Sequence, residues 1–474
     1  MESEIRLDYG DQAIVDFIPS QLQRSDRFIP LQIPPKLPAM SWEEGLRRAT
    51  SLPVGDCPSL EIICKEYYRG GDVGIIVDDY TRPNHHTRKF LPILLEFLSS
   101  WGVPMERVKL VIATGTHREP NRKEFDQIFG IGIYEKFKEQ VVTHYPDKNN
   151  VVVGELDGIP VEMDRTVYAC EIVVALTDID NHYFAGVAGG PKAFLPGVAG
   201  ERIITHEHLH MFSDTGFAEN VRLGNLDNNP VFEKKRAIVQ IMMDALRKKR
   251  THVYTTACIL DSDGDLVFSK GGEVLAVHKL AARTIPEVWT VKVRRSPDVV
   301  IAGAKNVGVN LYQAVKATHA AYNAVRPGGI ILTAAPCPDS FGNEAFKRLM
   351  KIAADVFHEH QNKPDMNPYI PMAMSAVLTA VRADFRIGKQ KPVDMIRILK
   401  HVGWGHLHWI ADGLSPEEQK ILPFVFYGDS SAPAGERLRK WVRRYLEATN
   451  HTFTVLNNPG YLVLVEQDTS AVTT

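Results

Sequence analysis

Short apolar runs and helical patterns alternate along most of this chain, and this alternation constrains its fold more than any other feature. Residues 72–78 (DVGIIVD) predict a buried strand, residues 90–101 predict a packed helix, and residues 109–113 predict the next strand. Further along, residues 121–139 predict another helix, and residues 264–273 predict a turn before a helix. Helices between successive strands indicate a mainly parallel sheet, because parallel neighbours need a long crossover connection. The pattern therefore predicts an α/β fold with mainly parallel sheets.

The length of the chain and a second alternation predict two domains. A chain of 474 residues exceeds the size of one ordinary core. A new series of strand and helix patterns begins at about residue 298, after a helix gives way to the segment TVKVRRSP. We expect an N-terminal α/β domain at residues 1–285 and a C-terminal α/β domain at residues 286–474. The last segment is a candidate to pack back on the first domain.

The composition argues against several classes of protein. A formal net charge of −2 gives no charge-dominated nucleic-acid or membrane-surface footprint, and no apolar run approaches the length of a membrane span. The polar, acidic N-terminus is unlike a signal peptide. The motifs GxGxxG, GxxxxGK[ST] and GxSxG are missing from the sequence, so it supports no standard dinucleotide, P-loop or nucleophile-elbow site. Five cysteines without CxxC spacing indicate reduced thiols in a cytoplasmic protein.

Residues 186–200 (GVAGGPKAFLPGVAG) hold five glycines around a single lysine, Lys192. Glycine allows a positive φ and a close approach of the backbone to a ligand. A lysine in such small, apolar surroundings is a candidate for chemistry or anchoring, and the alternative is a glycine-rich turn with an incidental lysine. Histidines on both sides of this segment, at His182 and from His206 onward, favour the functional interpretation.

Three polar segments, DDYTRP, GTHR and DIDNH, follow predicted strands in the first half of the chain. Ligand crevices of open parallel sheets form outside the carboxyl ends of the strands, so we expect these segments to converge on one crevice. Their histidines could carry acid–base chemistry near neutral pH. The candidate residues are Asp79, Arg82, His117 and His182. Other histidines are expected in loops or at the surface, namely His85, His86, His358, His360, His406 and His408.

Residues 206–210 (HEHLH) match the HExxH pattern of zinc hydrolases. On a helix, His206 and His210 would share a face that can hold zinc, with Glu207 as the general base. On an extended segment, all three histidines would share a face instead. Because the match is only five residues long, the segment could equally be rich in histidine without binding a metal. A zinc-dependent hydrolase is therefore the alternative function.

A predicted helix at residues 310–325 places Tyr312, Lys316 and His319 along one stripe. An ordinary amphipathic helix with a solvated polar face explains this pattern equally well. In the functional interpretation, the cationic and phenolic side chains would suit a carboxylate substrate and would close the crevice from the second domain.

Several of these motifs occur together in order: DDYTRP, GTHR, His182, GGPKAFLPG, His208 sixteen residues after Lys192, and YQAVK. Together they resemble the nickel-dependent lactate racemase family, from LDYG near the start to beyond residue 320. The resemblance implies a two-domain α/β enzyme with its active site in the cleft between the domains.

The resemblance also implies a cofactor, a nickel-pincer nucleotide (pyridinium-3-thioamide-5-thiocarboxylate mononucleotide) with Ni(II), attached covalently at Lys192. His208 matches the family's nickel ligand, and one imidazole is consistent with square-planar Ni(II). The family's two acid–base histidines fall on His117 and His182. The other matched residues are Arg82, Tyr312, Gln313 and Lys316 for the substrate, and Asp79, Gly189 and Gly190 for the cofactor.

The implied function is a racemase or epimerase that inverts C2 of a 2-hydroxy acid, lactate-like or larger. A hydride would pass to and from the cofactor while a histidine takes the hydroxyl proton. Arg82 and Lys316 would hold the carboxylate of the substrate. The implied partners are this small molecule and the proteins that synthesise the cofactor, with neither nucleic acid nor membrane. A non-catalytic protein that binds the cofactor or an organic acid is a third hypothesis.

Overall fold

The structure of the chain, a computed structural model, describes residues 5–386, 388–428 and 432–466. It is an α/β protein whose two main sheets consist mostly of parallel strands, which confirms the fold class predicted from the sequence. None of the helices in these ranges has both the length and the apolar character needed to cross a bilayer. All five cysteines are free thiols.

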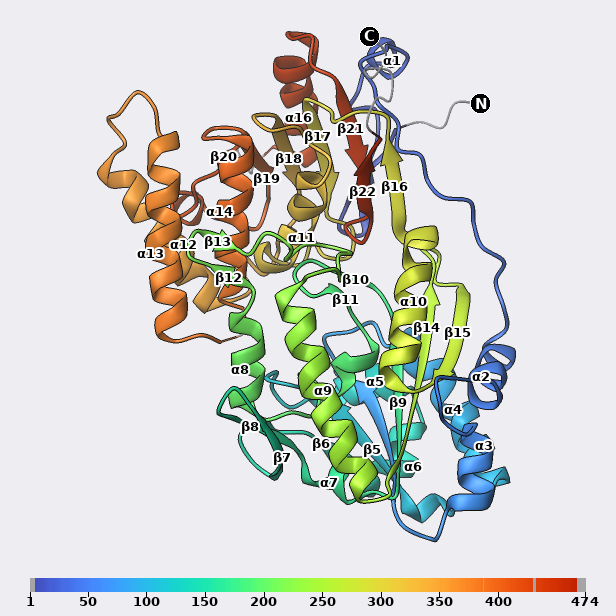
Figure 1. Ribbon diagram of the computed structural model, residues 1–474. Coiled ribbons are helices and arrows are strands. Elements are labelled where there is room, and N and C mark those ends of the chain that lie inside the picture. Colours follow the sequence, from blue (N-terminus) through green and yellow to red (C-terminus); the bar gives the residue numbers. More distant parts are fainter. Residues whose placement is uncertain (1–4, 387, 429–431, 467–474) are drawn as a thin grey trace, which may run out of the picture. The chain divides into compact units, whose positions relative to one another are not determined.

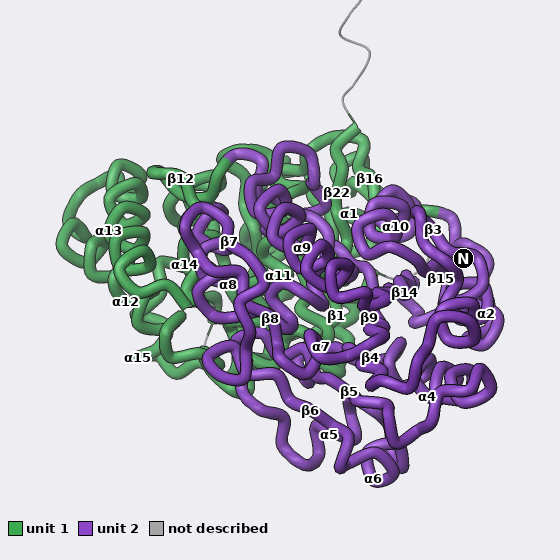
Figure 2. Tube along the Cα trace, turned by 60° about the horizontal axis from the view of Figure 1, so that its bottom comes forward, with its two compact units in different colours: residues 1–34, 212–218, 289–474 green, residues 35–211, 219–288 purple. Residues whose placement is uncertain are grey.

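Two compact units make up the chain, and each is assembled from separate segments (Figure 2). Unit 2 consists of residues 35–211 and 219–288, and unit 1 consists of residues 1–34, 212–218 and 289–474. Unit 1 therefore includes the first 34 residues, which the sequence prediction assigns to the N-terminal domain.

A seven-stranded sheet forms the centre of unit 2 (Figure 1). All neighbouring strands are parallel except β14 and β15. The central strands are buried along nearly their whole length, as their continuous Val, Ile and Leu content requires. In spatial order the strands are β3 (Pro53–Val54), β15 (Leu266–Gly272), β14 (His252–Leu260), β9 (Ile172–Asp178), β4 (Val73–Asp78), β5 (Val108–Ala113) and β6 (Val141–Thr143).

The prediction of a turn at residues 264–273 is wrong, because most of this segment forms β15, paired antiparallel with β14. Its glycines are needed by close packing of the backbone. A Cβ on Gly271 would lie 2.2 Å from the carbonyl oxygen of Ala49, and one on Gly272 would lie 2.1 Å from that of Val54. Glycine inside a strand commonly marks such a close approach.

Helices pack around this sheet and supply much of its core (Figure 1). Phe90 and Leu94 on α4 are buried in the same apolar cluster as Ile75 and Val174 of the central strands. The helices of unit 2 are α2 (Trp42–Ser51), α3 (Leu60–Ile62), α4 (His85–Ser100), α5 (Arg122–Phe129), α6 (Ile133–Phe137), α7 (Arg165–Ala169), α8 (Glu201–Leu209), α9 (Pro230–Lys248) and α10 (Val274–Trp289).

The single helix predicted at residues 121–139 is divided into α5 and α6. A capping box between Asn121 and Glu124 starts α5. Gly130 and Gly132, with φ values of 88° and 89°, then take the chain out of the right-handed helical region. The glycines therefore end one helix and start the next.

Unit 1 contains a five-stranded parallel sheet. The first residues of the chain belong to its core: Leu7 and Tyr9 are buried there, and the Tyr9 hydroxyl donates a hydrogen bond of 2.6 Å to Asp412. The sheet strands in spatial order are β20 (Val425–Phe426), β19 (Leu407–Ile410), β18 (Ile330–Ala334), β17 (Val299–Gly303) and β21 (Phe453–Leu456).

The remaining elements of unit 1 are short strand pairs and covering helices. The strands are β1 (Leu7–Tyr9), β2 (Gln12–Ile14), β12 (Phe212–Ser213), β13 (Gly216–Phe217), β16 (Thr290–Val293) and β22 (Leu462–Val465). The helices are α1 (Ser20–Gln23), α11 (Leu311–Tyr322), α12 (Glu344–Glu359), α13 (Ile370–Ala383), α14 (Gln390–Val402), α15 (Pro416–Gln419) and α16 (Ala434–Val442).

Candidate active site

Three polar loops leave neighbouring strands at one edge of the unit 2 sheet. The strands β9, β4 and β5 are adjacent and parallel, so their carboxyl ends lie at the same edge. The DDYTRP loop follows β4, the GTHR loop follows β5 and the DIDNH loop follows β9. This is the edge at which an open parallel sheet binds its ligands. The crevice expected from the sequence therefore has its three loops on adjacent strands.

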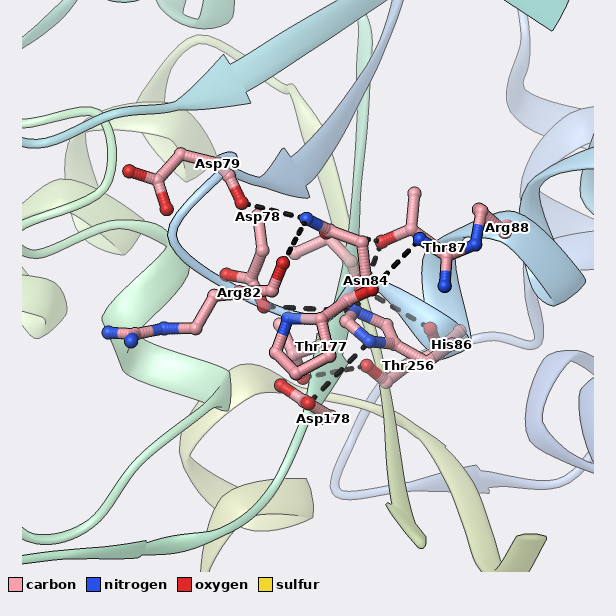
Figure 3. Close-up of polar contacts among 12 residues, drawn as sticks. Asp78, Asp79, Arg82, Asn84, His86, Thr87, Arg88, Thr177, Asp178 and Thr256 are labelled. Carbon is pink, nitrogen blue, oxygen red and sulfur yellow. Dashed lines mark hydrogen bonds and ion pairs between the residues drawn. The ribbon is translucent and has the colours of Figure 1, made fainter. Parts of the chain in front are cut away.

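The DDYTRP loop is held in place by a buried asparagine, Asn84 (Figure 3). Its backbone is left-handed, with φ of 54°, and its side-chain amide donates to the carbonyl oxygens of Asp79 and Arg82. The Thr81 hydroxyl donates to Oδ1 of Asp79 at 2.7 Å. These bonds fix the orientation of the Asp79 carboxylate.

Asp79 and His117 form a hydrogen-bonded pair. Oδ2 of Asp79 lies 2.5 Å from Nδ1 of His117. Burial opposes ionisation of Asp79, but the hydrogen bond from His117 and the nearby charges of His117 and Arg82 hold its pKa below the usual value. Asp79 is buried, whereas the His117 side chain is partly exposed. An ionised carboxylate thus orients an imidazole that still reaches solvent.

A second cluster at the same edge contains His86, Asp78 and Asp178. The expectation that His86 lies in a loop or at the surface is therefore wrong. His86 is fully buried on α4, with its ring nitrogens 3.8 Å from Asp78 and 3.6 Å from Asp178 (Figure 3). Burial and the charge of Asp178 raise the pKa of Asp78 to about 6, while His86 and Arg82 offset part of that rise. The two strand-end carboxylates therefore share one imidazole.

Lys192 lies in a short 3₁₀ turn, Gly190–Ala193, close enough to these carboxylates to interact with their charges. Burial, with the positive charges of Arg82 and Lys235, lowers the pKa of Lys192 to about 7. A lysine with this pKa is largely a neutral amine at slightly alkaline pH, and a neutral amine is nucleophilic.

The glycines before Lys192 are required by the packing of the protein itself. Gly189 has φ of 79°, and a Cβ there would lie 2.1 Å from the carbonyl oxygen of Asp178. A Cβ on Gly190, which has φ of 50°, would lie 2.9 Å from Cβ of the buried His278. Both glycines let the loop lie directly against the end of β9 and against α10. Their contact with a cofactor stays a prediction.

His182 belongs to the small antiparallel pair β10 (Asn181–His182) and β11 (Gly186–Val187). The Ala185 amide donates to its Nδ1 at 3.2 Å. Burial, followed by the charges of Lys192 and Lys235, lowers the pKa of His182 well below its usual value. His182 is therefore a neutral imidazole whose Nδ1 accepts the backbone hydrogen bond, so its proton lies on Nε2.

The HEHLH segment is helical, in α8, and its middle histidine is buried. Nδ1 of His208 lies 2.9 Å from the carbonyl oxygen of Ile204 and 2.5 Å from the carboxylate of Glu207. Glu207 is fully buried and also pairs with Lys235 at 3.5 Å. Because Nδ1 is engaged as a donor, Nε2 is the atom of His208 that could bind a metal.

The buried ring of Phe184 contacts both His182 and His208. Its centre is 4.4 Å from the ring centre of His182, which it meets edge-on, and 5.4 Å from that of His208. The proposed acid–base histidine and the candidate metal ligand therefore contact the same aromatic side chain.

The burial of Glu207 removes the general base from the zinc-hydrolase alternative. A hydrolase of that kind needs Glu207 exposed to a water bound between the outer histidines. Here Glu207 is buried and salt-bridged, whereas His206 and His210 are only half-buried. The HExxH spacing is present without the arrangement that hydrolysis requires.

The residues predicted to hold the substrate from the second domain lie on α11 of unit 1. Tyr312, Gln313 and Lys316 are half-buried there, and the Lys391 ammonium lies 3.8 Å from the centre of the Tyr312 ring. His319 is buried and bonds to Asp394 at 2.9 Å, so it does not share a solvated stripe with Lys316. That the α11 residues share a pocket with those of unit 2 stays a prediction.

Sequence reasoning named Glu207 and the DIDNH segment but missed how the buried groups of the site pair, and it missed Lys235. Glu207 and Lys235 come from different helices. Asp178, the partner of His86, comes from a strand that is far away in the sequence but close in space. The one available signal is an ionisable residue inside an apolar pattern, and that signal does not name a partner.

His408, expected at the surface, is also buried, on β19 of unit 1. There it accepts a hydrogen bond of 2.8 Å from the indole nitrogen of Trp441. The buried indole needs a partner, and the histidine supplies it. This histidine is therefore structural.

Comparison with known proteins decides the family. The model of the lactate racemase N-terminal domain matches residues 32–219, and that of the lactate racemase C-terminal domain matches residues 293–367. The lactate racemase of Thermoanaerobacterium thermosaccharolyticum is 31% identical over 321 residues, which cover 67% of this chain and 71% of that protein. The chain belongs to the lactate racemase family. The lactate racemase of Lactiplantibacillus plantarum is 29% identical over 65% of this chain and 69% of that protein.

Solved structures show the same fold. The lactate racemase apoprotein from T. thermosaccharolyticum matches with a TM-score of 0.75 and 24% identity, over 98% of this chain and 100% of that one. A Thermotoga maritima protein matches with a TM-score of 0.60 and 15% identity, over 87% of this chain and 99% of that one. The lactate racemase fold therefore extends across almost the whole length of this chain.

Proposed function

We propose that this protein is a racemase or epimerase that inverts C2 of a 2-hydroxy acid, lactate-like or larger. Membership of the lactate racemase family supports an isomerase. The observation that carries the proposal is the presence of two imidazoles in one unit with the amine of Lys192. His117 is hydrogen-bonded to a carboxylate, whereas His182 is held neutral by burial and nearby cations. Inversion at C2 needs proton transfer to and from a hydroxyl group in two orientations, which two histidines can provide.

The site has side chains that fit a nickel-pincer nucleotide. Lys192 combines a half-buried side chain with a pKa of about 7, which suits a covalent amine tether. His208 is held by hydrogen bonding at Nδ1, so Nε2 would bind Ni(II). When bound, this cofactor supplies an electron-poor pyridinium that accepts and returns a hydride.

The chain's own residues would then manage the proton and the orientation of the substrate. Asp79 keeps His117 in the tautomer with the proton on Nδ1, so Nε2 takes the hydroxyl proton. His182, held neutral by its burial and cationic surroundings, carries its proton on Nε2 and would donate it to the substrate oxygen when the hydroxyl group forms in the opposite orientation. Arg82 and Lys316 would grip the carboxylate. The pocket would be completed by Tyr312 and Gln313.

The remaining parts of the proposal follow from the need for this cofactor. Proteins that synthesise the nickel-pincer nucleotide would be partners, and loading would occur in the cytoplasm. The substrate is a small molecule, and the proposal involves neither nucleic acid nor a membrane.

Protein produced together with the cofactor-synthesis proteins tests this function. We expect intact-mass analysis to show a nucleotide adduct that is missing from Lys192→Ala, and metal analysis to show one nickel per chain. A panel of chiral lactate, malate, aromatic 2-hydroxy acids and sugar acids would then identify the substrate by racemisation. An unmodified mass with no bound nickel would overturn the tether, and a loaded enzyme inert towards the whole panel would overturn the racemase proposal.

A further inference from the structure

The two outer histidines of the HEHLH segment, which the proposed chemistry does not use, form a pair on one face of α8. His206 and His210 are four residues apart, and His210 still has helical backbone angles, with φ of −67° and ψ of −8°. Their ring centres are 4.9 Å apart. Nδ1 of His210 donates to the carbonyl oxygen of His206 at 2.8 Å, so Nε2 of His210 carries the lone pair. Both side chains are half-buried, so a metal ion could reach them from solvent.

A third ligand reaches this pair from the hairpin of β7 (Asn150–Leu156) and β8 (Ile159–Asp164). Asp157 and Gly158 form its two-residue turn, with φ of 54° and 76°, as a type I′ hairpin turn requires. The turn places Oδ2 of Asp157 3.0 Å from Nε2 of His206. The tightness of this turn gives Asp157 a defined position.

The geometry points to a Zn²⁺ site formed by Asp157, His206 and His210. Ligand atoms of the three side chains lie within 4.8 Å of one another. Tetrahedral zinc with bonds of about 2.0–2.1 Å needs its ligand atoms about 3.3 Å apart, which small side-chain rotations would provide. Two imidazoles and one carboxylate match the nitrogen and oxygen ligands that zinc takes, with water in the fourth position.

Asp157 is ionised, as a metal ligand must be, but its carboxylate already pairs with the ammonium of Lys234. Hydrogen bonds from Lys234 and then His206 lower the pKa of Asp157, so the carboxylate is ionised. The Lys234 ammonium lies 2.5 Å from Oδ2 of Asp157 and occupies part of the position that a metal would take. Zinc must displace this lysine, whose side chain is partly exposed on α9. Removing Lys234 should therefore strengthen zinc binding.

The bound metal would connect α8 to the hairpin without acting as a hydrolytic centre. Glu207 lies on the buried side of α8, paired with Lys235, so it cannot serve this metal as a general base. The same helix carries His208. Zinc would therefore stabilise the helix that bears the proposed nickel ligand, although the site itself depends only on Asp157, His206 and His210.

Zinc titration of the full chain, made without cofactor-synthesis proteins and stripped with EDTA, tests this site. Calorimetry with ZnCl₂ should show one tight site and a zinc-dependent rise in Tm. His210→Ala and Asp157→Asn should each weaken binding by about 10-fold or more, and Lys234→Met should tighten it severalfold. X-ray absorption at the zinc edge should show two imidazoles among the ligands.

His208→Ala is the matched control, since it removes a histidine from the same helix but not from this site, and it should keep the zinc. Unfolding in EDTA shows whether each variant still folds, and His210→Gln replaces His210→Ala where it does not. Wild-type affinity in both His210→Ala and Asp157→Asn would overturn the proposal. So would loss of zinc from His208→Ala with retention in His210→Ala.

Discussion

Nδ1 of His117 lies 2.5 Å from Oδ2 of Asp79, and this bond joins the loops that follow two adjacent strands, β5 and β4. The other carboxylate oxygen accepts from Thr81, so the carboxylate cannot rotate away without losing a second hydrogen bond. The pair resembles the carboxylate–histidine arrangement that fixes one tautomer of a catalytic imidazole. In the proposed mechanism, Asp79 therefore acts through His117.

Asp79→Asn should lower the turnover of the loaded enzyme on the order of 100-fold or more, because an amide can donate to Nδ1 and favour the wrong tautomer. KM should change much less. The amount of nucleotide adduct seen by mass spectrometry separates this role from the cofactor contact that the resemblance implies for Asp79, because only loss of that contact would lower it. Asp126→Asn, which alters an exposed ion pair with Arg122, is the control and should keep full activity. A turnover in Asp79→Asn equal to that of wild type would contradict the role of Asp79.

Lys192 should react with amine reagents at unusually low pH in the cofactor-free protein. Its pKa of about 7 means that the neutral amine forms as the pH rises through 7, several units below an ordinary lysine. We expect labelling of Lys192, followed by peptide mass mapping, to reach half its maximal rate near pH 7. Lys192→Arg should lack this fast-reacting site. A labelling profile that rises only above pH 9 would contradict the prediction.

The sequence was sufficient to predict the parts of the site that depend on local pattern. The apolar runs that end at Asp78 and Ala113 predict where β4 and β5 stop, because a buried strand ends where polar residues begin. The loops after these strands carry Asp79 and His117, so the candidate residues could be named before their contact was known. Strand order was the missing step, since no local pattern shows that β9, β4 and β5 are neighbours.

Burial of charge could not be predicted in the same way. Nδ1 of the buried His86 lies 3.6 Å from the carboxylate of Asp178, a residue far away in the sequence. The buried Glu207 pairs with Lys235, which comes from another helix. A charged group enters a core only with its partner, and such a partner has no fixed spacing in sequence. The hydroxyl group of the buried Tyr9 in unit 1 likewise donates its hydrogen bond to Asp412, which is far away in the sequence.

Asp78→Asn should stabilise the cofactor-free protein at pH 8 more than at pH 4. The folded-state pKa of Asp78 is raised to about 6 from 3.8, so the folded state binds the proton more tightly than the unfolded state. Ionised Asp78 therefore costs stability, with the cost absent below pH 3.8 and complete above about pH 6. We expect the gain in unfolding free energy to grow on the order of 1–3 kcal/mol between pH 4 and pH 8.

Urea unfolding of Asp78→Asn and wild type at both pH values measures this difference. Asp126→Asn serves as the control at an exposed position. A stabilisation by Asp78→Asn that is larger at pH 4 than at pH 8 would have the wrong sign. It would show that ionised Asp78 is not disfavoured by its surroundings.

Gly189→Ala tests whether the loop before Lys192 is required by packing. A Cβ at Gly189 would lie 2.1 Å from the backbone oxygen of Asp178, and φ is 79°, so the variant has both a clash and an unfavourable backbone angle. Gly70→Ala is the matched control, because Gly70 has φ of 96° but no atom within 4 Å of the added Cβ. Gly70→Ala should cost about 1–2 kcal/mol of unfolding free energy, and Gly189→Ala about 3 kcal/mol or more.

The difference between these two variants isolates the clash from the backbone strain, because both positions have a positive φ. Urea unfolding of the cofactor-free protein measures it without any contribution from a bound nucleotide. Equal losses in the two variants would mean that the end of β9 moves away from the added methyl group. The glycine would then be explained by its backbone angle alone, and close packing against Asp178 would no longer account for it.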